Sequence, residues 1–174
     1  PPKPFLGAKG VLALLRNDGK NNQLEAILLS FIKKPSLDFA RQYIPETLLV
    51  GRQAESFESV KEKTSNKKYV LKESISSGMK GTVFSDSPNF EKVLFGACKS
   101  NMNWILQEEV ENQAQTFSWF DNENDSKPRT SKDWLMRVTT QYVNRQLADV
   151  IITARRDKAV HGAKDCIQIG AIVL

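Results

Sequence analysis

KKYVLKESISSGMKGTVF, from Lys67 to Phe84, is the stretch around which the rest of the chain is organised. Its pattern predicts a strand from Lys68 to Lys72, a small polar loop with two glycines from Ser74 to Thr82, and a second short strand that ends at Ser85. Because side chains alternate along a strand, Lys72 projects its charge on the face over which the loop folds. A fixed lysine beside a glycine loop is an arrangement that suits a phosphate group.

Donors in the loop favour the same interpretation. Gly78 and Gly81 allow backbone conformations that aim N–H groups at an anion, and Ser76, Ser77 and Thr82 add hydroxyl donors. A β-hairpin with a flexible turn and a solvated lysine is the alternative explanation of this stretch taken alone. The elements on either side of this stretch are therefore needed to choose between a phosphate-binding loop and a hairpin.

Length and composition limit the classes of fold and partner that suit this chain. The chain has 174 residues, 40% hydrophobic and 26% charged, which suits one globular domain or two lobes sharing a cleft. A formal net charge of +5 suits a polyanionic partner, which is either nucleic acid or nucleotide phosphates, and charge alone does not choose between them. The basic residues are spread along the chain in short pairs that suit a solvated surface. Cys98 and Cys166 make no disulfide framework and predict a cytoplasmic protein. No apolar run has the length of a membrane span.

The residues before the central strand predict mostly helix. The expected elements are helices over Gly10 to Arg16, Gln23 to Ile32, Leu37 to Gln42 (with Ser36 as N-cap) and Ser56 to Thr64, and a strand over Thr47 to Val50. In the second helix an apolar residue recurs at helical spacing, which predicts a buried stripe. Its members are Leu24, Ile27, Leu28 and Phe31.

After the glycine loop, Ser87 as N-cap and Pro88 at the first helical position predict a helix from Asn89 to Lys99. The remaining expected elements are strands over Trp104 to Val110, Gln113 to Phe120, Trp134 to Val143, Leu147 to Ala154 and Cys166 to Val173, a polar loop over Asp121 to Lys132, and a turn at Asn144-Arg145. The fold class is therefore α+β with a largely antiparallel C-terminal sheet. We expect a helical segment 1–66, a site-bearing segment 67–110 and a β-rich lobe 111–174, in a piece of a longer chain.

The order of these parts separates the nucleotide-binding folds. No Gly-x-x-x-x-Gly-Lys-Ser/Thr or Gly-x-Gly-x-x-Gly motif is present, so the P-loop and dinucleotide folds have no support. In protein kinases the glycine loop precedes the lysine strand, whereas here the lysine comes first.

Lysine strand, glycine loop, helix, and then a strand reading WILQEEV is an order that resembles the ATP-grasp superfamily. The segment before the central strand is most similar to the circularly permuted branch, which includes glutathionylspermidine synthase and related carboxylate–amine ligases. The matching motifs, in order, are Lys9 before Val11 to Leu15, then Ile44 to Thr47 (IPET), Val70 to Lys72, Gly78 to Gly81, and Gln107-Glu108. The resemblance covers about Lys9 to Val110.

The resemblance implies an ATP site and a set of residue roles. Lys9 and Lys72 would contact the ATP phosphates. The flap over the β- and γ-phosphates would be Ser77, Gly78, Met79, Lys80 and Gly81, with Lys80 as an extra charge. The adenine edge would meet the backbone from Gln107 to Val110, and Glu108 or Glu109 would hold the ribose. Strand alternation places Gln107 and Glu109 on one face and Glu108 on the other, without showing which face meets the nucleotide.

The implied reaction is transfer of the γ-phosphoryl group to a small-molecule or peptide carboxylate, giving an acylphosphate that an amine displaces. Arg137 is the candidate catalytic residue that steadies the transferred phosphate, against the alternative of a solvated or ion-paired sheet arginine. Mg²⁺ is implied as well, but its ligands are not identified: Asp149 and Asp165 are isolated, and the resemblance implies ligands upstream of the lysine helix.

Other parts of the sequence allow more than one interpretation. His161 lies in a turn with Arg155, Arg156 and Lys164, which form either a basic rim for an acidic substrate or a solvated loop. The three tryptophans, Trp104, Trp119 and Trp134, fall on separate strands and favour core packing. A nucleotide-binding regulatory module without turnover and a basic nucleic-acid-binding domain remain as alternative functions.

Overall fold

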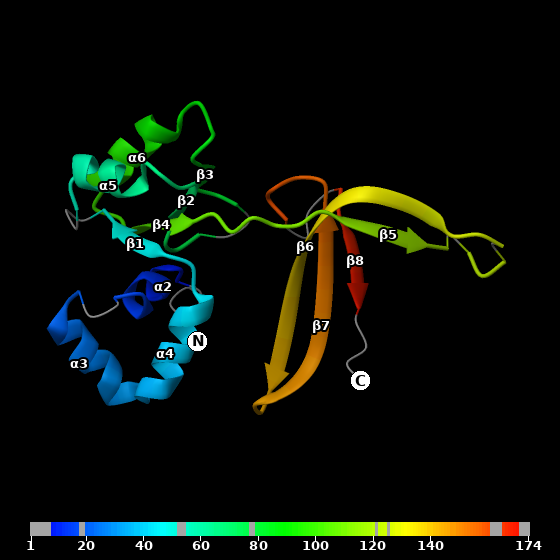
Figure 1. The fold of residues 1–174 in the computed structure, drawn as a ribbon, viewed down its shortest axis with the longest axis horizontal. Helices are drawn as coiled ribbons and strands as arrows, with labels where there is room; N and C mark the ends of the chain where they lie inside the picture. Colours follow the sequence, from blue (N-terminus) through cyan, green and yellow to red (C-terminus); the bar gives the residue numbers. More distant parts are fainter. Residues whose placement is uncertain are drawn as a thin grey trace. The chain divides into compact units, whose positions relative to one another are not determined.

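The chain folds into two compact units, residues 1–110 and 111–174, in a computed structural model that describes residues 8–17, 20–51, 55–76, 79–120, 122–124, 126–160 and 165–170. The fold is α+β with two four-stranded antiparallel sheets, one in each unit (Figure 1). The expected fold class is therefore confirmed at this level. Among the described residues, no helix is long and apolar enough to cross a membrane.

The first unit contains one sheet with the order β1-β4-β2-β3 and helices on both of its sides (Figure 1). Its elements are α2 (Gly10–Leu15), α3 (Asn22–Phe31), α4 (Lys34–Tyr43), β1 (Thr47–Val50), α5 (Phe57–Thr64), β2 (Tyr69–Glu73), β3 (Thr82–Phe84), α6 (Phe90–Lys99) and β4 (Trp104–Glu108). The strand that carries Lys72 thus lies inside the sheet, between β4 and β3.

The hydrophobic core occupies one face of this sheet, beneath α5 and α6. Alternation along β2 and β4 sends Tyr69, Leu71 and Leu106 into this core, where each is at most 1% exposed. They pack against Val60 of α5 and Leu94 of α6, among others. The opposite face carries Lys72, as alternation predicts, together with the residues that form the site described below.

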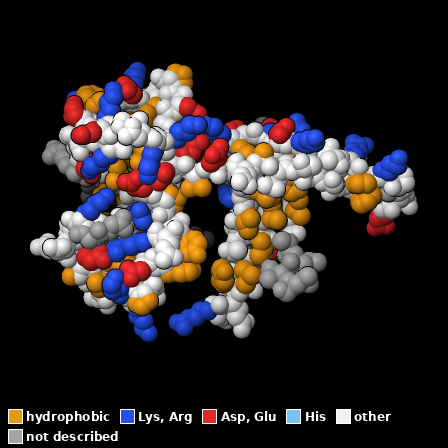
Figure 2. Space-filling model, in the orientation of Figure 1, with side chains coloured by type: hydrophobic (Ala, Val, Ile, Leu, Met, Phe, Trp, Pro, Cys, Tyr) orange, Lys and Arg blue, Asp and Glu red, His pale blue; other side chains and the backbone are white. Residues whose placement is uncertain are grey.

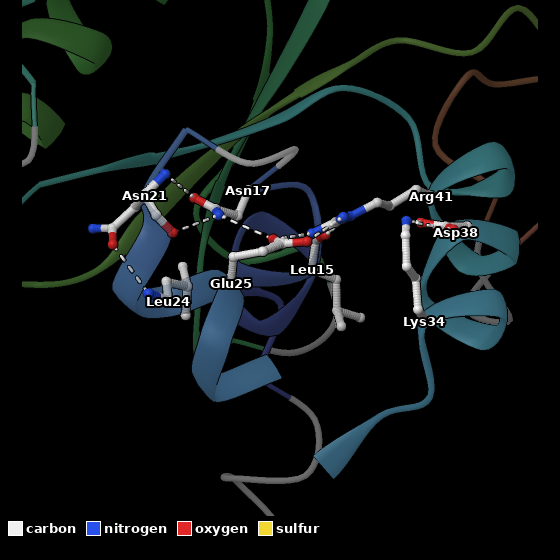
Figure 3. A network of polar contacts seen from close by, with 8 residues as sticks. All are labelled: Leu15, Asn17, Asn21, Leu24, Glu25, Lys34, Asp38 and Arg41. Carbon is white, nitrogen blue, oxygen red and sulfur yellow. Dashed lines mark hydrogen bonds and ion pairs between the residues drawn. The ribbon is translucent and has the colours of Figure 1, made fainter. Parts of the chain in front are cut away.

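A polar network holds the three N-terminal helices together (Figure 3). The guanidinium of Arg41 in α4 forms a bidentate pair with Glu25 in α3, at 2.9 and 2.7 Å, and its Nε donates to the carbonyl of Leu15 at the end of α2. Asn17 donates to Glu25, and the Asn21 side chain caps α3 by accepting from the backbone of Leu24. Fork-shaped arginine pairing fixes both distance and orientation, so this network sets how α3 meets α4.

The expected buried stripe on α3 is wrong. The helix itself forms as predicted, but it has no buried residue, and Ile27 and Phe31 are 56% and 86% exposed. Periodic spacing predicts which side of a helix is apolar, whereas burial needs another element packed over that side. In this structure α3 is tied to its neighbours by its polar side instead.

Two helix starts also differ from the sequence prediction. Helix α4 begins at Lys34 with Lys33 as its N-cap, not at Leu37 with Ser36, because Pro35 fits the first turn, where its missing N–H costs nothing. Helix α6 begins at Phe90 with Asn89 as its N-cap, and Ser87 contributes only its backbone carbonyl to the amide of Phe90. Both helices otherwise occupy the expected residues.

The second unit is a meander with the order β5-β6-β7-β8. Its strands are β5 (Gln115–Trp119), β6 (Arg129–Val143), β7 (Gln146–Arg155) and β8 (Ile167–Gly170). The predicted turn at Asn144-Arg145 is confirmed, with positive φ values of 50° and 68° that match the twist of a hairpin. The expected loop from Asp121 to Lys132 is too long at its end, because β6 already pairs with β5 from Arg129.

Candidate functional site

The face of the first sheet opposite the core gathers two lysines from distant parts of the sequence. Lys72 is the next-to-last residue of β2, and Lys9 is the N-cap of α2. The Lys72 side chain is half-buried. Burial first, and the positive charge of Lys9 second, lower the pKa of Lys72 below its ordinary value. An anion beside Lys72 would offset this effect of burial and of the second positive charge.

Lys72 has a neutral partner. Its Nζ donates to Oε1 of Gln107 at 2.8 Å, and within the part of the chain that the structure describes no carboxylate is bonded to it. The two residues come together because β2 and β4 pair antiparallel with Val70 opposite Gln107 and Lys72 opposite Ile105. Gln107 and Lys72 thus lie two residues apart in register on one face.

The Gln107 amide is held in turn by Thr47 of β1. Gln107 Nε2 donates to Thr47 Oγ1 at 3.1 Å, and the Thr47 hydroxyl donates to the carbonyl of Pro45 at 2.8 Å. Gln107 and Thr47 are only 9% and 3% exposed. Ile44 to Thr47 (IPET) and Gln107-Glu108 are separate motifs in the sequence. In the structure they meet, because Thr47 and Gln107 pair on the adjacent strands β1 and β4.

Lys9 is fastened to the loop that follows β2. Its Nζ donates to the carbonyl and the hydroxyl of Ser76, at 2.7 and 3.0 Å, and lies 3.4 Å from the carbonyl of Glu73. The backbone beside it makes two more contacts with buried Ser74: Lys9 N to its carbonyl at 2.8 Å, and Gly10 N to its hydroxyl at 3.0 Å. Lys9 therefore shapes the start of the glycine loop in this structure.

The end of the loop is a tight turn that leads into β3. Met79 and Gly81 have φ values of 67° and 66°, and the amide of Thr82 donates to the carbonyl of Met79 at 3.1 Å. Thr82 then pairs directly with Lys72, so its hydroxyl lies on the site face. Lys80 is exposed on the turn. Ser77 and Gly78 lie outside the described residues.

Glu108 faces the other way. Its carboxylate lies 3.2 Å from Nζ of Lys67, which also lies 3.2 Å from the carboxylate of Glu46. Tyr69, which is paired with Glu108 in register, donates its hydroxyl to Glu46 at 3.2 Å. The predicted alternation is confirmed here: Gln107 points toward Lys72 and Glu108 toward the side of Tyr69.

The charges of this cluster shift the pKa values of its members. Burial raises the pKa of Glu46, but the hydrogen bonds from Lys67 and Tyr69 and the charge of Lys67 outweigh it, so the net shift is downward. The hydrogen bonds to Glu46 and Glu108 raise the pKa of Lys67. The sequence prediction missed Lys67 and Tyr69 as members of a cluster, although their period-two spacing at the start of β2 indicated that they share a face.

Glu109 and Val110 follow β4 at the end of the first unit. The amide of Glu109 donates to the carbonyl of Lys68 at 2.8 Å, which extends the β2–β4 ladder by one bond. The Val110 side chain is exposed. Alternation continued one residue beyond β4 predicts that Glu109 lies on the side of Gln107.

Arg137 belongs to the second unit. It is exposed on β6 and pairs in register with Thr153 of β7. In the same unit Arg156 lies over the ring of Trp134 at 5.2 Å and donates to Ser131 at 2.6 Å. His161 and Lys164 fall outside the described residues.

The tryptophans divide between core and surface. Trp104 packs against the first core, as expected, and Trp134 is half-buried with Phe117 at its edge, 6.4 Å between ring centroids. Trp119 is 37% exposed near the end of β5, so the expectation of core packing is wrong for it.

Metal-binding side chains are not clustered in what the structure describes: no group there brings together three or more His, Cys, Asp or Glu residues. Mg²⁺ therefore stays a prediction of the sequence resemblance, and its ligands are not identified. Comparison with known proteins finds no family model that matches the chain and no curated protein that matches it significantly.

Proposed function

We propose that residues 1–110 form the phosphate-binding part of an ATP site of the ATP-grasp type, in an ATP-dependent carboxylate–amine ligase. The observation that carries this proposal is the pairing of Lys72 with a neutral amide beside a second lysine. A half-buried ammonium without a carboxylate partner costs free energy in the empty protein. An anionic ligand on that face removes the cost, which is a reason for a sequence to keep the lysine there.

The arrangement of the neighbours supports phosphate as that anion. Lys72 and the Thr82 hydroxyl project side by side from adjacent strands, and Lys9 lies close enough for its charge to act on Lys72. Charge-assisted hydrogen bonds from ammonium and hydroxyl groups are those that phosphate oxygens accept best. Figure 2 shows lysine and arginine side chains on the surface of the first unit, mixed with acidic ones, so charge by itself does not mark the site.

The proposed reaction begins when a carboxylate oxygen of the acid substrate attacks the γ-phosphorus, while the bond to the bridging oxygen breaks and ADP leaves. An amine then attacks the acyl carbon and releases inorganic phosphate, which leaves an amide. The protein's share is to position the reactants and to offset the negative charge that spreads over the transferred group. Lys72 and Lys9 supply that charge.

Thermal denaturation with and without ATP and magnesium chloride tests the binding step. Wild type is expected to gain stability with ligand, by about 2.7 kcal/mol at a hundredfold excess over Kd. Lys72→Met is expected to weaken binding at least about tenfold, because a hydrogen bond to a charged group contributes about 1.5–3 kcal/mol. Lys92→Met is the matched control, since it removes one positive charge from the exposed side of α6.

The outcome separates the alternative functions. No ligand-dependent shift in wild type, or the same shift in Lys72→Met, would overturn the proposal. Retention on a polyanion column that falls steeply with salt, and that is the same for wild type and Lys72→Met, would instead identify a nucleic-acid-binding domain. Binding of ATP with ADP release at background, measured with candidate acids and amines, would identify a nucleotide-binding module without turnover.

A further inference from the structure

We infer that Gln107 is a positioning residue for the phosphate lysine: its amide, oriented by Thr47, holds Lys72 on the site face without neutralising it. This inference rests on the proposed function, because the neutrality of the amide matters only if the lysine serves an anion. It assigns to the Gln107 side chain a task apart from the backbone contact with adenine that the sequence resemblance implies.

The direction of the hydrogen bonds carries the first step. The Thr47 hydroxyl donates its hydrogen to the carbonyl of Pro45, so its oxygen is left as an acceptor. The amide nitrogen of Gln107 donates to that oxygen, and the amide oxygen therefore turns toward Lys72. An amide has one donor end and one acceptor end, so fixing one end fixes the other. Thr47 thus decides that Lys72 meets an oxygen.

The second step compares two lysines on the same pair of strands. Lys67 lies just before β2, is paired with two carboxylates, and has its pKa raised. Lys72 lies within β2, is bonded to an amide, and has its pKa lowered by burial and by Lys9. Two neighbours on β4 supply partners to these lysines: Glu108 pairs with Lys67, which Glu46 also binds, and Gln107 bonds to Lys72. Strand alternation sends the carboxylate to one lysine and the amide to the other.

The third step concerns the other charged groups around Lys72. Lys9 is the one whose charge lowers its pKa. The adjacent carboxylate on β2, Glu73, projects to the opposite face, where it lies against Gly81 and near Trp104. β1 and β3 carry no charged side chain, and Arg16 beyond α2 donates to the carbonyl of Arg41. A carboxylate at position 107 would therefore be a new counter-ion for Lys72, and it would compete with a phosphate for the same ammonium.

The test measures two quantities in each variant: the pKa of the Lys72 amine, from NMR titration of isotope-labelled lysine assigned with Lys72→Met, and the affinity for ATP with magnesium, from calorimetry. Gln107→Glu is expected to raise the Lys72 pKa and to weaken ATP binding by about tenfold or more, the effect of one charged hydrogen bond. Gln23→Glu adds the same charge on exposed α3 and is expected to change neither quantity.

Thr47 provides a second set of variants in case Gln107→Glu folds poorly. Thr47→Val removes the acceptor that orients the amide, so ATP affinity is expected to fall by roughly three- to tenfold. Thr47→Ser keeps the hydroxyl and is expected to restore the affinity. Loss with valine and recovery with serine would show that the hydroxyl acts, and not the volume of the side chain.

Two results would overturn the inference while leaving the proposed function in place: ATP affinities of Gln107→Glu and Thr47→Val within about twofold of wild type, or a Lys72 pKa that Gln107→Glu does not raise. A wild-type chain that binds no ATP defeats the proposed function instead. In that case the Lys72 pKa in Gln107→Glu still decides whether residue 107 controls the charge of the lysine.

Discussion

The ammonium nitrogen of Lys9 lies 2.7 Å from the carbonyl oxygen of Ser76, a residue 67 positions later in the chain. The contact joins the start of α2 to the loop after β2, and buried Ser74 joins them again through the backbone of Lys9 and Gly10. Because the loop follows directly on the strand of Lys72, α2 and the site are built as one piece. Substitutions at the start of α2 should therefore alter the conformation of the loop after β2.

Lys9→Met is expected to lower the free energy of unfolding by about 1–2 kcal/mol, since it removes partly buried hydrogen bonds to the loop that solvent only partly replaces. Urea denaturation measures the change. Lys92→Met, on the exposed side of α6, should stay within about 0.5 kcal/mol of wild type. Equal stabilities for the two variants would contradict the role of Lys9 as a tether.

Gly10→Ala and Gly96→Ala are expected to change stability in opposite directions. A Cβ at Gly10 would lie 2.8 Å from Oγ of Ser74, so alanine pushes the serine off the Gly10 amide and costs about 1–3 kcal/mol. A Cβ at Gly96 meets nothing within 4 Å, and alanine there gains about 0.5–1 kcal/mol of helix propensity in α6. Thermal or urea denaturation of both variants checks the pair, and a stable Gly10→Ala would refute the close approach.

The pH dependence of stability is expected to show the lowered pKa of Lys72. Burial and Lys9 lower its pKa below the ordinary 10.5, so below the folded-state pKa the protonated group opposes folding. As pH rises from the folded-state pKa toward 10.5, the unfolded chain holds more protons and stability increases. Lys72→Met should remove this increase and, without ATP, should be at least as stable as wild type near neutral pH. Urea denaturation across that range tests it, and a strongly destabilised Lys72→Met would argue against an uncompensated charge.

Tyr69 should show the opposite trend in alkali. Burial first, then the charge of Glu46 and the hydrogen bond to it, raise the Tyr69 pKa from 10.0 to about 12. The stability that this neutral phenol contributes is complete below pH 10.0 and is lost as pH rises through about 12. Tyr69→Phe should therefore flatten the alkaline decline, at a cost of about 1 kcal/mol near neutral pH for the lost hydrogen bond. An unchanged alkaline slope in denaturation curves would count against it.

The candidate site shows which features a local sequence pattern predicts and which contacts it does not. Period-two alternation separated Lys72 from Tyr69 and Leu71, and Gln107 from Glu108, because the pleat of a strand can be predicted without knowing its partner strand. It did not predict that Gln107 meets Lys72, since that contact depends on the register of β2 against β4, and β3 and α6 lie between these strands in the chain. The same register, unseen in sequence, brings Lys67 between Glu46 and Glu108.

Most helices and strands, and the two faces of each strand, could be predicted from sequence, because propensity, proline and glycine positions, and alternation act over a few residues. Only the tertiary structure decided which lysine is matched by carboxylates and which by an amide, because counter-ions come from strands distant in the chain. It also decided that Phe31 of α3 stays exposed while Leu71 of β2 is fully buried. Burial belongs to the surface that another element covers, and no local pattern contains that element.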